Sequence, residues 1–499
     1  MFIIHLKQLT MKKIIINGLL LGCLTVSVVS CKKTLELNPT HSAEGSEIFT
    51  RIEDYEFALT GTYTRLLQNS YYGSTGGSNA FVGLPDMMSD NVFESSESLA
   101  NYQNFSRWNY VADDPLVKDT WEDAYRVVQQ ANLTLRGIDK FAGANAGAVN
   151  RIKAQALALR ALAHFDLLRY YGEDYDRNST AKGVPYVDVF DIEQKPARLS
   201  VKQTYDKIEA DLKNAKTLMT AMDHSIQTNG TSGGDRSYVD DMVVNAILAR
   251  MYLYANSLDS AVKYSTLVIN ARPLASRTVF PNIWVDASTA EVVWSVKFEA
   301  FNSDIGANIF YSVGNRASYR PTTNLVALYD QVNDVRFSSY FRNLLRGAAR
   351  LTSPARLVMI KYDARLNTLP KPDGIVNFKA FRTGEMYLIR AEAYARLGGV
   401  SEALGLADLN TLRAARINGY APVILTGTAL KNAIADERRK ELMGEGHRFF
   451  DIKRTTRIIN RTTNCTSFCT LASGAREWAL PIPQSEMLAN ENMVQNGGY

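Results

Sequence analysis

The sequence lacks most features that assign a chain quickly to a structural class. Four cysteines in 499 residues exclude a disulfide-built scaffold, and 31 glycines with 14 prolines are too few for a low-complexity chain. Only one long uncharged run is present, near the N-terminus, so no second membrane-spanning segment is expected. Charged residues make up 21% and apolar residues 46%, a globular balance that excludes disorder of the whole chain.

The usual signatures of catalysis and nucleic-acid binding are also missing. No P-loop, dinucleotide fingerprint or G-x-S-x-G elbow is found, and His41, His164 and His224 have no metal-ligand spacing. The net charge is +5, but no basic stripe accompanies it. We therefore expect no cofactor, no metal, no catalytic residue and no nucleic-acid partner.

The N-terminus has the layout of a secretory signal. Lys12 and Lys13 precede an uncharged run from Ile14 to Ser30, and Cys31 follows small residues in a string that looks like a bacterial lipobox. We predict a lipoprotein signal peptide over 1–30 with lipidation at Cys31; the alternative is a transmembrane anchor, and either Met1 or Met11 is the start. The signal carries three lysines and no acid, so the 56 basic residues fall to 53 against 51 acidic. A nearly neutral mature chain suits a neutral ligand.

Helical periodicity dominates the remainder. The patterns predict helices over 121–141, 148–171, 200–222 and about 429–443, and helix pairs over 241–270 and 385–416. Both pairs place alanine, tyrosine and alanine at the same relative positions, 142 residues apart, as in antiparallel tetratricopeptide hairpins separated by large insertions. The segments 69–114 and 278–323 are rich in loop residues, with a short strand predicted at 291–297.

Several motifs follow one another in order along the chain, the most specific being GEMYLIRAEAYARLG at 384–398, ERRKELMGEGHRFFDIKR at 437–454 and LPIPQSEMLANENMVQNGGY at 480–499. Together they resemble the RagB/SusD-like outer-membrane nutrient-binding lipoproteins of Bacteroidota. The resemblance implies a mainly α fold, a right-handed tetratricopeptide-like superhelix with large loop-rich insertions and minor β-structure. It implies one domain over 31–499, with ligand-site insertions at about 69–114 and 278–323 and a family-type C-terminal region over about 437–499.

The resemblance also implies a role in nutrient capture rather than catalysis. Such a protein would bind oligosaccharides or polysaccharides at the outer membrane, on the cell surface, and deliver them to a SusC-like TonB-dependent transporter. Two alternatives remain open: the same architecture capturing peptides, or an all-helical glycoside hydrolase. Lys32 and Lys33 directly after Cys31 depart from the acidic residues that often accompany surface export, so the periplasmic leaflet also stays open.

Family members place their ligand among the two insertions, so the carry-over is regional. Sugar recognition needs flat aromatic rings for stacking and polar side chains for paired hydrogen bonds. On this basis we predict Trp108, Tyr72 and Tyr319 as stacking groups. Asp90, Asn91 and Arg316 are predicted as hydrogen-bonding groups.

The motif at 437–454 permits a catalytic interpretation. Glu437, Glu441 and Glu445 follow each other at helical spacing, and clustered carboxylates can supply a general acid. The surrounding arginines and lysines favour instead an ion-pair network that ties the last core helix to a strand-like segment over 449–453. Near the C-terminus, Cys465 and Cys469 favour a local disulfide over a zinc site.

Overall fold

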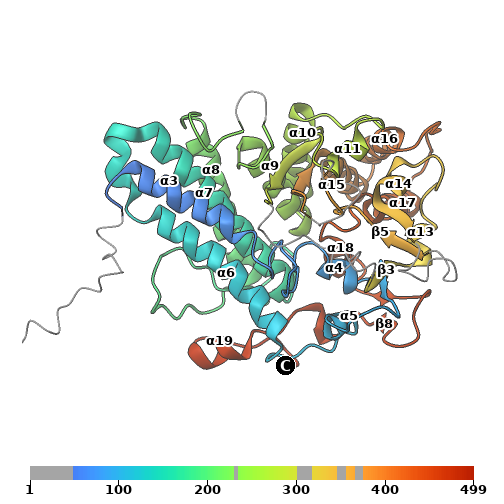
Figure 1. Ribbon diagram of the computed structural model, residues 1–499, viewed down its shortest axis with the longest axis horizontal. Coiled ribbons are helices and arrows are strands. Elements are labelled where there is room, and N and C mark those ends of the chain that lie inside the picture. Colours follow the sequence, from blue (N-terminus) through green and yellow to red (C-terminus); the bar gives the residue numbers. More distant parts are fainter. Residues whose placement is uncertain (1–48, 230–233, 300–316, 345–355, 366–374) are drawn as a thin grey trace, which may run out of the picture. The chain divides into compact units, whose positions relative to one another are not determined.

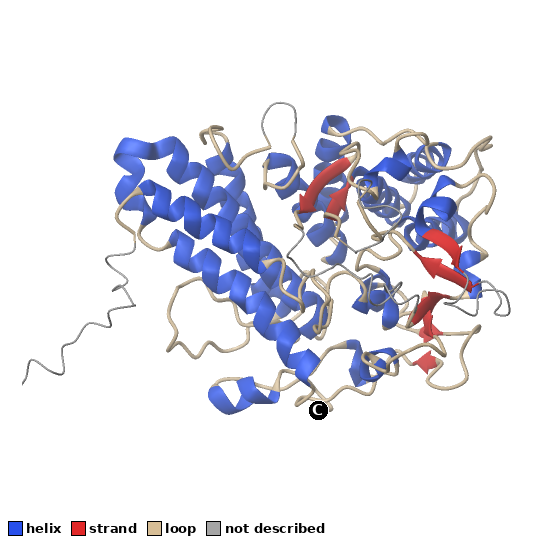
Figure 2. Cartoon of the chain, in the orientation of Figure 1, coloured by secondary structure: helices blue, strands red, loops and turns tan. Residues whose placement is uncertain are grey.

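The computed structural model describes residues 49–229, 234–299, 317–344, 356–365 and 375–499. Residues 55–499 form one compact unit. The predicted signal peptide, Cys31 and Arg316 lie outside the described residues. Helices make up most of the regular structure, which confirms the mainly α class (Figure 2). None of the described helices is both long and apolar enough to cross a membrane.

The longer helices form the core, and shorter ones lie in the connections between them and in the C-terminal region (Figure 1). The longer ones are α3 (Ile52–Arg65), α6 (Pro115–Leu135), α7 (Ala142–Tyr171), α8 (Val201–Met219), α9 (Asp241–Tyr254), α10 (Leu258–Ala271), α15 (Thr383–Leu397), α16 (Ser401–Ala414) and α17 (Gly427–Glu441). The shorter ones are α4 (Leu84–Met87), α5 (Gln103–Ser106), η2 (Ile138–Phe141), α11 (Phe280–Ile283), α13 (Thr323–Val326), α14 (Val335–Tyr340), α18 (Arg448–Arg454), η4 (Arg476–Trp478) and α19 (Gln484–Ala489).

Successive long helices pack side by side in a continuous stack. Helix α6 packs on α7, α7 on α8, α8 on α9 and α9 on α10. Helix α10 then packs directly on α15, although a long insertion separates them in sequence, and α15 packs on α16 and α17. The two predicted hairpins are therefore neighbours in one superhelix. At Gly405 a Cβ would lie 2.8 Å from the Ala391 carbonyl, so α16 approaches α15 closely only because position 405 has no side chain.

Local signals explain where the helices begin and end. Ser200 caps α8 in a capping box with Gln203, as its position predicted. Asp114 accepts a hydrogen bond from the Leu116 amide and Pro115 occupies the first turn, so α6 begins six residues before the predicted start.

One predicted element is wrong. The segment 449–453, expected to be strand-like, lies in helix α18. Its Phe449, Phe450 and Ile452 are all buried, and such a short apolar run fits a buried strand or a buried helix equally well. The tertiary structure decided the outcome.

Within the described ranges, the strands form four separate antiparallel pairs. They are β1 (Val92–Glu94) with β3 (Tyr319–Pro321), β2 (Val292–Val296) with β6 (Phe378–Arg382), β4 (Phe341–Leu344) with β5 (Arg356–Met359), and β7 (Ile459–Asn460) with β8 (Thr470–Leu471). Strand β2 confirms the prediction at 291–297. The β1–β3 pair joins the two insertions, because Val92 lies opposite Pro321 and Glu94 opposite Tyr319.

Candidate functional site

A polar cleft of about 410 Å³ lies where three distant segments meet. We call it the β1 cleft. Strand β1 and the following loop form one wall, helix α5 a second, and the loop between β7 and β8 a third. Its lining residues are Met87, Val92, Phe93, Glu94, Ser95, Ser96, Ser98, Gln103, Ser106, Arg107, Tyr319, Arg461, Asn464, Cys465, Thr466 and Ser467.

Hydrogen bonds from two backbone amides beyond the β1–β3 pair fix the first wall. The Ser95 amide donates to the Ser318 carbonyl at 2.8 Å, and the Ala317 amide donates to Glu97 Oε2 at 3.1 Å. Two loops more than 200 residues apart in sequence are thus held in one register. The cleft is preformed rather than assembled from independent loops.

Polar side chains on the wall are arranged around Glu94. Arg107 Nη2 lies 3.0 Å from Glu94 Oε2, and Gln103 Nε2 donates to Glu94 Oε1 at 2.5 Å. Burial opposes ionisation, but the donors of Gln103, Ser98 and Arg107 outweigh it and lower the Glu94 pKa. The cleft therefore presents an ionised carboxylate beside a half-exposed guanidinium, a combination that can bind hydroxyl groups from both sides.

Arg461 holds the base of the cleft together. Its guanidinium donates to the carbonyls of Ser106 at 2.6 Å, Ser89 at 2.8 Å and Met87 at 3.1 Å, and lies 4.0 Å from the centroid of the Trp108 ring. Burial lowers the Arg461 pKa to about 10. The residues around Arg461 in the sequence form no motif that predicts a structural role in the cleft. Only the fold identifies Arg461 as the residue that connects the walls.

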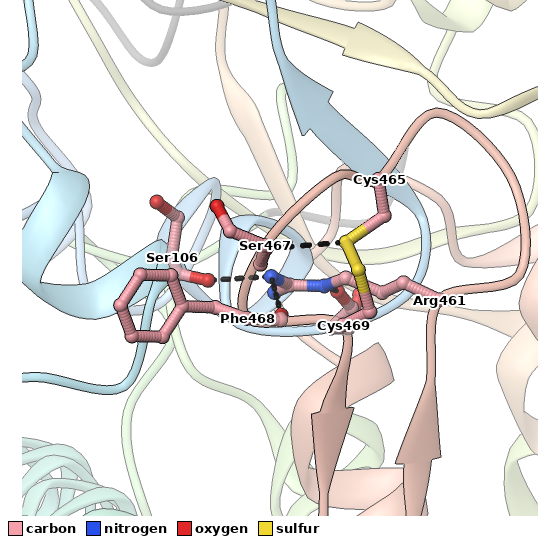
Figure 3. The surroundings of a disulfide bond; sticks show 7 residues. Ser106, Arg461, Cys465, Ser467, Phe468 and Cys469 are labelled. Atoms are coloured by element: carbon pink, nitrogen blue, oxygen red, sulfur yellow. Dashed lines mark hydrogen bonds between the residues drawn. A yellow bond between two sulfur atoms is a disulfide. The ribbon is translucent and has the colours of Figure 1, made fainter.

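The third wall carries the disulfide. Cys465 and Cys469 are bonded, the pairing that the sequence favoured over zinc (Figure 3). Asn464 Oδ1 accepts from the Thr323 amide at 2.9 Å, which ties this loop to the segment after β3. Ser467 lies between the two cysteines on the cleft side, so the bond closes the loop that forms the rim.

The structure corrects two of the predicted stacking groups. Tyr72 is only 2% exposed, and its ring packs 4.8 Å from that of Phe378 in the main core. Trp108 is 6% exposed; its Nε1 donates to the Met88 carbonyl and Arg461 covers a ring face. Neither ring is free to stack on a sugar, because aromatic side chains in loops can serve as core as readily as those in helices.

Asp90 and Asn91 also serve the framework. Asp90 forms a paired contact with Arg448 at 2.7 and 3.0 Å, while Asn91 receives Arg439 Nε at 2.7 Å and donates to Asp86 at 2.6 Å. Burial opposes ionisation of Asp90, but Arg448 and then Arg439 lower its pKa to about 2. Both predicted ligand groups are therefore committed to internal partners, and we correct their assignment.

Among the predicted residues that the structure describes, Tyr319 alone lines the cleft. It is only 1% exposed, so it contributes an edge rather than an open ring face. Its ring lies edge-on to that of Tyr102, 6.4 Å away. Arg316 immediately precedes this region but falls outside the described residues.

The carboxylates of the 437–454 motif are inaccessible. Glu441 is fully buried and accepts hydrogen bonds from Arg336, Arg382 and Arg416 at 2.9–3.3 Å. Burial opposes its ionisation, but Arg416, Arg382 and Arg336 hold the Glu441 pKa well below its usual range. A general acid needs access to substrate and a proton near neutral pH. The interpretation of this motif as catalytic carboxylates is therefore wrong, and the ion-pair network is confirmed.

His164 and Trp284 are likewise internal, whereas His224 is exposed. His164 is fully buried; burial lowers its pKa to about 3, and its Nε2 accepts from the Val187 amide at 3.0 Å. Trp284, which lies near a predicted loop, is 3% exposed, with Lys361 over its ring. Across the described ranges, no group of three or more potential ligand side chains is placed to hold a metal ion.

Comparisons with known proteins place this architecture in a family. Residues 59–253 match the family described as "Starch-binding associating with outer membrane", and residues 373–499 match the "SusD family". Together with the helical superhelix, these matches define a protein of the SusD superfamily. The chain belongs to the SusD/RagB-like family.

Relatives resemble it over nearly their whole length. A SusD superfamily protein from Bacteroides thetaiotaomicron has a crystal structure with a TM-score of 0.77, 25% identity, and coverage of 89% of this chain and 99% of that one. A SusD-like carbohydrate binding protein from Bacteroides vulgatus has a TM-score of 0.72 and 23% identity, covering 89% of this chain and 98% of that one. SusD-like protein P38 of Formosa agariphila is 24% identical over 90% of this chain and 92% of its own length.

Proposed function

We propose that this protein is a lipid-anchored, non-catalytic glycan-binding protein that captures oligosaccharides or polysaccharides in the β1 cleft. The observation that carries the proposal is the match of residues 59–253 to the starch-binding, outer-membrane-associated family, since this segment contributes β1 and α5 to the cleft. The described carbohydrate-binding relative from Bacteroides vulgatus supports the same ligand class.

The chemistry of the cleft fits a glycan. Glu94 accepts hydrogen bonds, Arg107 donates them, and the hydroxyls of Ser95, Ser96, Ser98, Ser106 and Ser467 do both. A sugar ring presents several hydroxyls that each donate and accept, so alternating donors and acceptors along a wall suit it. Affinity for one open cleft should be modest, because water competes for every hydroxyl.

Calorimetric titration with a panel of neutral oligosaccharides, including maltoheptaose, tests the proposal. The key variant is Arg107→Ala, whose side chain is 40% exposed and 3.0 Å from Glu94. The matched control is Arg476→Ala, whose side chain is 43% exposed and 3.1 Å from Glu477, away from the cleft. Binding that weakens about tenfold only in Arg107→Ala supports the cleft. No binding of any glycan to the unaltered protein would overturn the proposal.

The proposal includes an anchor and a partner. Lipid on Cys31 would hold the protein in the outer membrane, facing the cell surface, and a SusC-like TonB-dependent transporter would take over the captured glycan. Support comes from the family's association with the outer membrane and from the lipobox-like string before Cys31. Labelled palmitate should enter the unaltered protein but not Cys31→Ala, and the transporter should co-purify with the anchored protein from detergent-solubilised membranes. Labelling of Cys31→Ala would contradict the lipid anchor on Cys31. Purification without any transporter would contradict the proposed partner.

A further inference from the structure

A second pocket, of about 280 Å³, lies against helix α6, and we call it the α6 pocket. It is near the lower end of the usual range for small-ligand sites, about 300 Å³. Its floor is formed by Trp121 and Tyr125, whose ring centroids are 4.8 Å apart. Its sides come from the loop between α7 and α8 and from α19. None of its lining residues belongs to the β1 cleft.

The α6 pocket is held open by its own hydrogen bonds. Tyr125 donates its hydroxyl to the Pro185 carbonyl at 2.8 Å, which fixes one end of the loop against α6. At the other end, Asn490 Nδ2 donates to the Pro196 carbonyl at 2.9 Å. The walls therefore keep their spacing without a ligand, which lowers the ordering cost of binding.

Two polar atoms in the pocket have unused hydrogen-bonding capacity. Trp121 is 4% exposed, and its Nε1 donates no hydrogen bond to any part of the chain that the structure describes. Gln129 Oε1 is buried and accepts none. A buried polar atom without a partner is costly, so the free acceptor of Gln129 indicates a missing ligand group that donates a hydrogen bond.

The charge of the lining restricts that ligand further. Three carboxylates, of Glu122, Asp191 and Glu486, accompany one guanidinium, of Arg126, which already pairs with Glu122 at 3.2 Å. An anionic ligand would be repelled. An ammonium group would be attracted, but it can only donate, whereas a sugar hydroxyl can also accept from the indole N–H of Trp121. A neutral sugar meets all conditions, because its hydroxyls donate and accept and its C–H face can lie on the aromatic floor.

We propose that the α6 pocket is a second glycan subsite, which takes one neutral sugar unit and excludes uronic acids and sulfated sugars. The inference rests on the proposed function, since it assumes that the protein binds glycans. It adds a site on the helical superhelix, separate from the insertions. Two separated contacts on one long chain would raise the avidity for polysaccharide over short oligosaccharide.

The double variant Gln129→Ala/Glu486→Ala tests the subsite in the full-length chain. Both side chains are partly exposed, so thermal unfolding should change little. The matched control is Glu491→Ala, which removes a 78% exposed carboxylate from the same C-terminal segment. Calorimetry uses the panel of maltoheptaose, cellohexaose, xylohexaose and laminarihexaose, with hexagalacturonate as the anionic probe and a lysine-containing peptide as the cationic one.

We expect two sites for at least one neutral oligosaccharide. The double variant should weaken one of them at least tenfold, Arg107→Ala should weaken only the other, and Glu491→Ala should change neither. Hexagalacturonate should not occupy the α6 pocket. A double variant that binds the whole panel as the unaltered protein does would overturn the subsite while leaving glycan binding in the β1 cleft intact. Occupation by a lysine-containing peptide and by no sugar would also overturn it. Failure of every glycan to bind the unaltered protein would remove the proposed function itself.

Discussion

Replacing Glu441 by glutamine should destabilise the protein strongly. The change removes one negative charge from a fully buried cluster, while the guanidinium groups of Arg336, Arg382 and Arg416 keep their positive charges. Breaking a buried ion pair from one side costs about 3–5 kcal/mol. Arg382 retains Glu291 and Glu445, and Arg416 retains Glu291, so we expect the lower end, about 3 kcal/mol.

Urea unfolding followed by circular dichroism measures this loss. The control Glu491→Gln removes a carboxylate that is 78% exposed and 3.5 Å from Lys195, and it should change the free energy of unfolding by less than about 0.5 kcal/mol. If Glu441→Gln unfolds at the same urea concentration as the unaltered chain, the network does not stabilise the core. If the purified protein also releases reducing sugar and Glu441→Gln abolishes it, the structural interpretation of the motif is refuted.

Three further predictions concern acid stability, helix packing and the rim of the β1 cleft. Burial opposes ionisation of Glu437, but Arg336 and its neighbours lower the Glu437 pKa to about 2. The folded state therefore binds a proton at this carboxylate more weakly than the unfolded state does. This stabilisation is complete above about pH 4.5 and is lost as the pH falls towards 2; acid titrations should show a shallower loss in Glu437→Gln. Gly405→Ala should lower the free energy of unfolding by about 1–3 kcal/mol in urea, because its Cβ would clash with the Ala391 carbonyl, and an unchanged value would contradict the close approach. The double variant Cys465→Ser/Cys469→Ser opens a very short loop, so it should lower the free energy of unfolding in urea by about 2 kcal/mol. It should also weaken oligosaccharide binding in calorimetry, and unchanged binding would show that the rim does not contact the glycan.

The helical core was largely predictable because its signals are local and periodic. The breaks between α9 and α10 and between α15 and α16 follow from turn residues, and Ser200 marks the start of α8 through its capping box. The charged motif was interpretable for a similar reason. Three carboxylates surrounded by arginines predict an ion-pair network, and the structure places that network in the core.

The residues of the site were less predictable than its region. The sequence indicated both insertions correctly, and β1 pairs with β3 between them. It could not show that the Trp108 ring packs against the Arg461 guanidinium. Nor could it show that Asp90 pairs with Arg448, or that Asn91 accepts a hydrogen bond from Arg439. Each of these contacts joins residues that are hundreds of positions apart, and loop composition carries no information on such pairs.

Trp121 shows the converse case. It opens the helix predicted over 121–141, and it is only 4% exposed. Only the loop between α7 and α8, and α19 from the far C-terminus, turn its remaining edge into the floor of a pocket.

The sequence by itself therefore determined the helical class, the paired hairpins and the motifs that identify the family, because these depend on periodicity and short-range chemistry. The tertiary structure decided which loop aromatics are core, which cation holds the β1 cleft together, and where polar atoms are left free for a ligand. Those outcomes depend on which distant segments pack together, and burial by distant segments determines whether a side chain faces solvent, a ligand or the core.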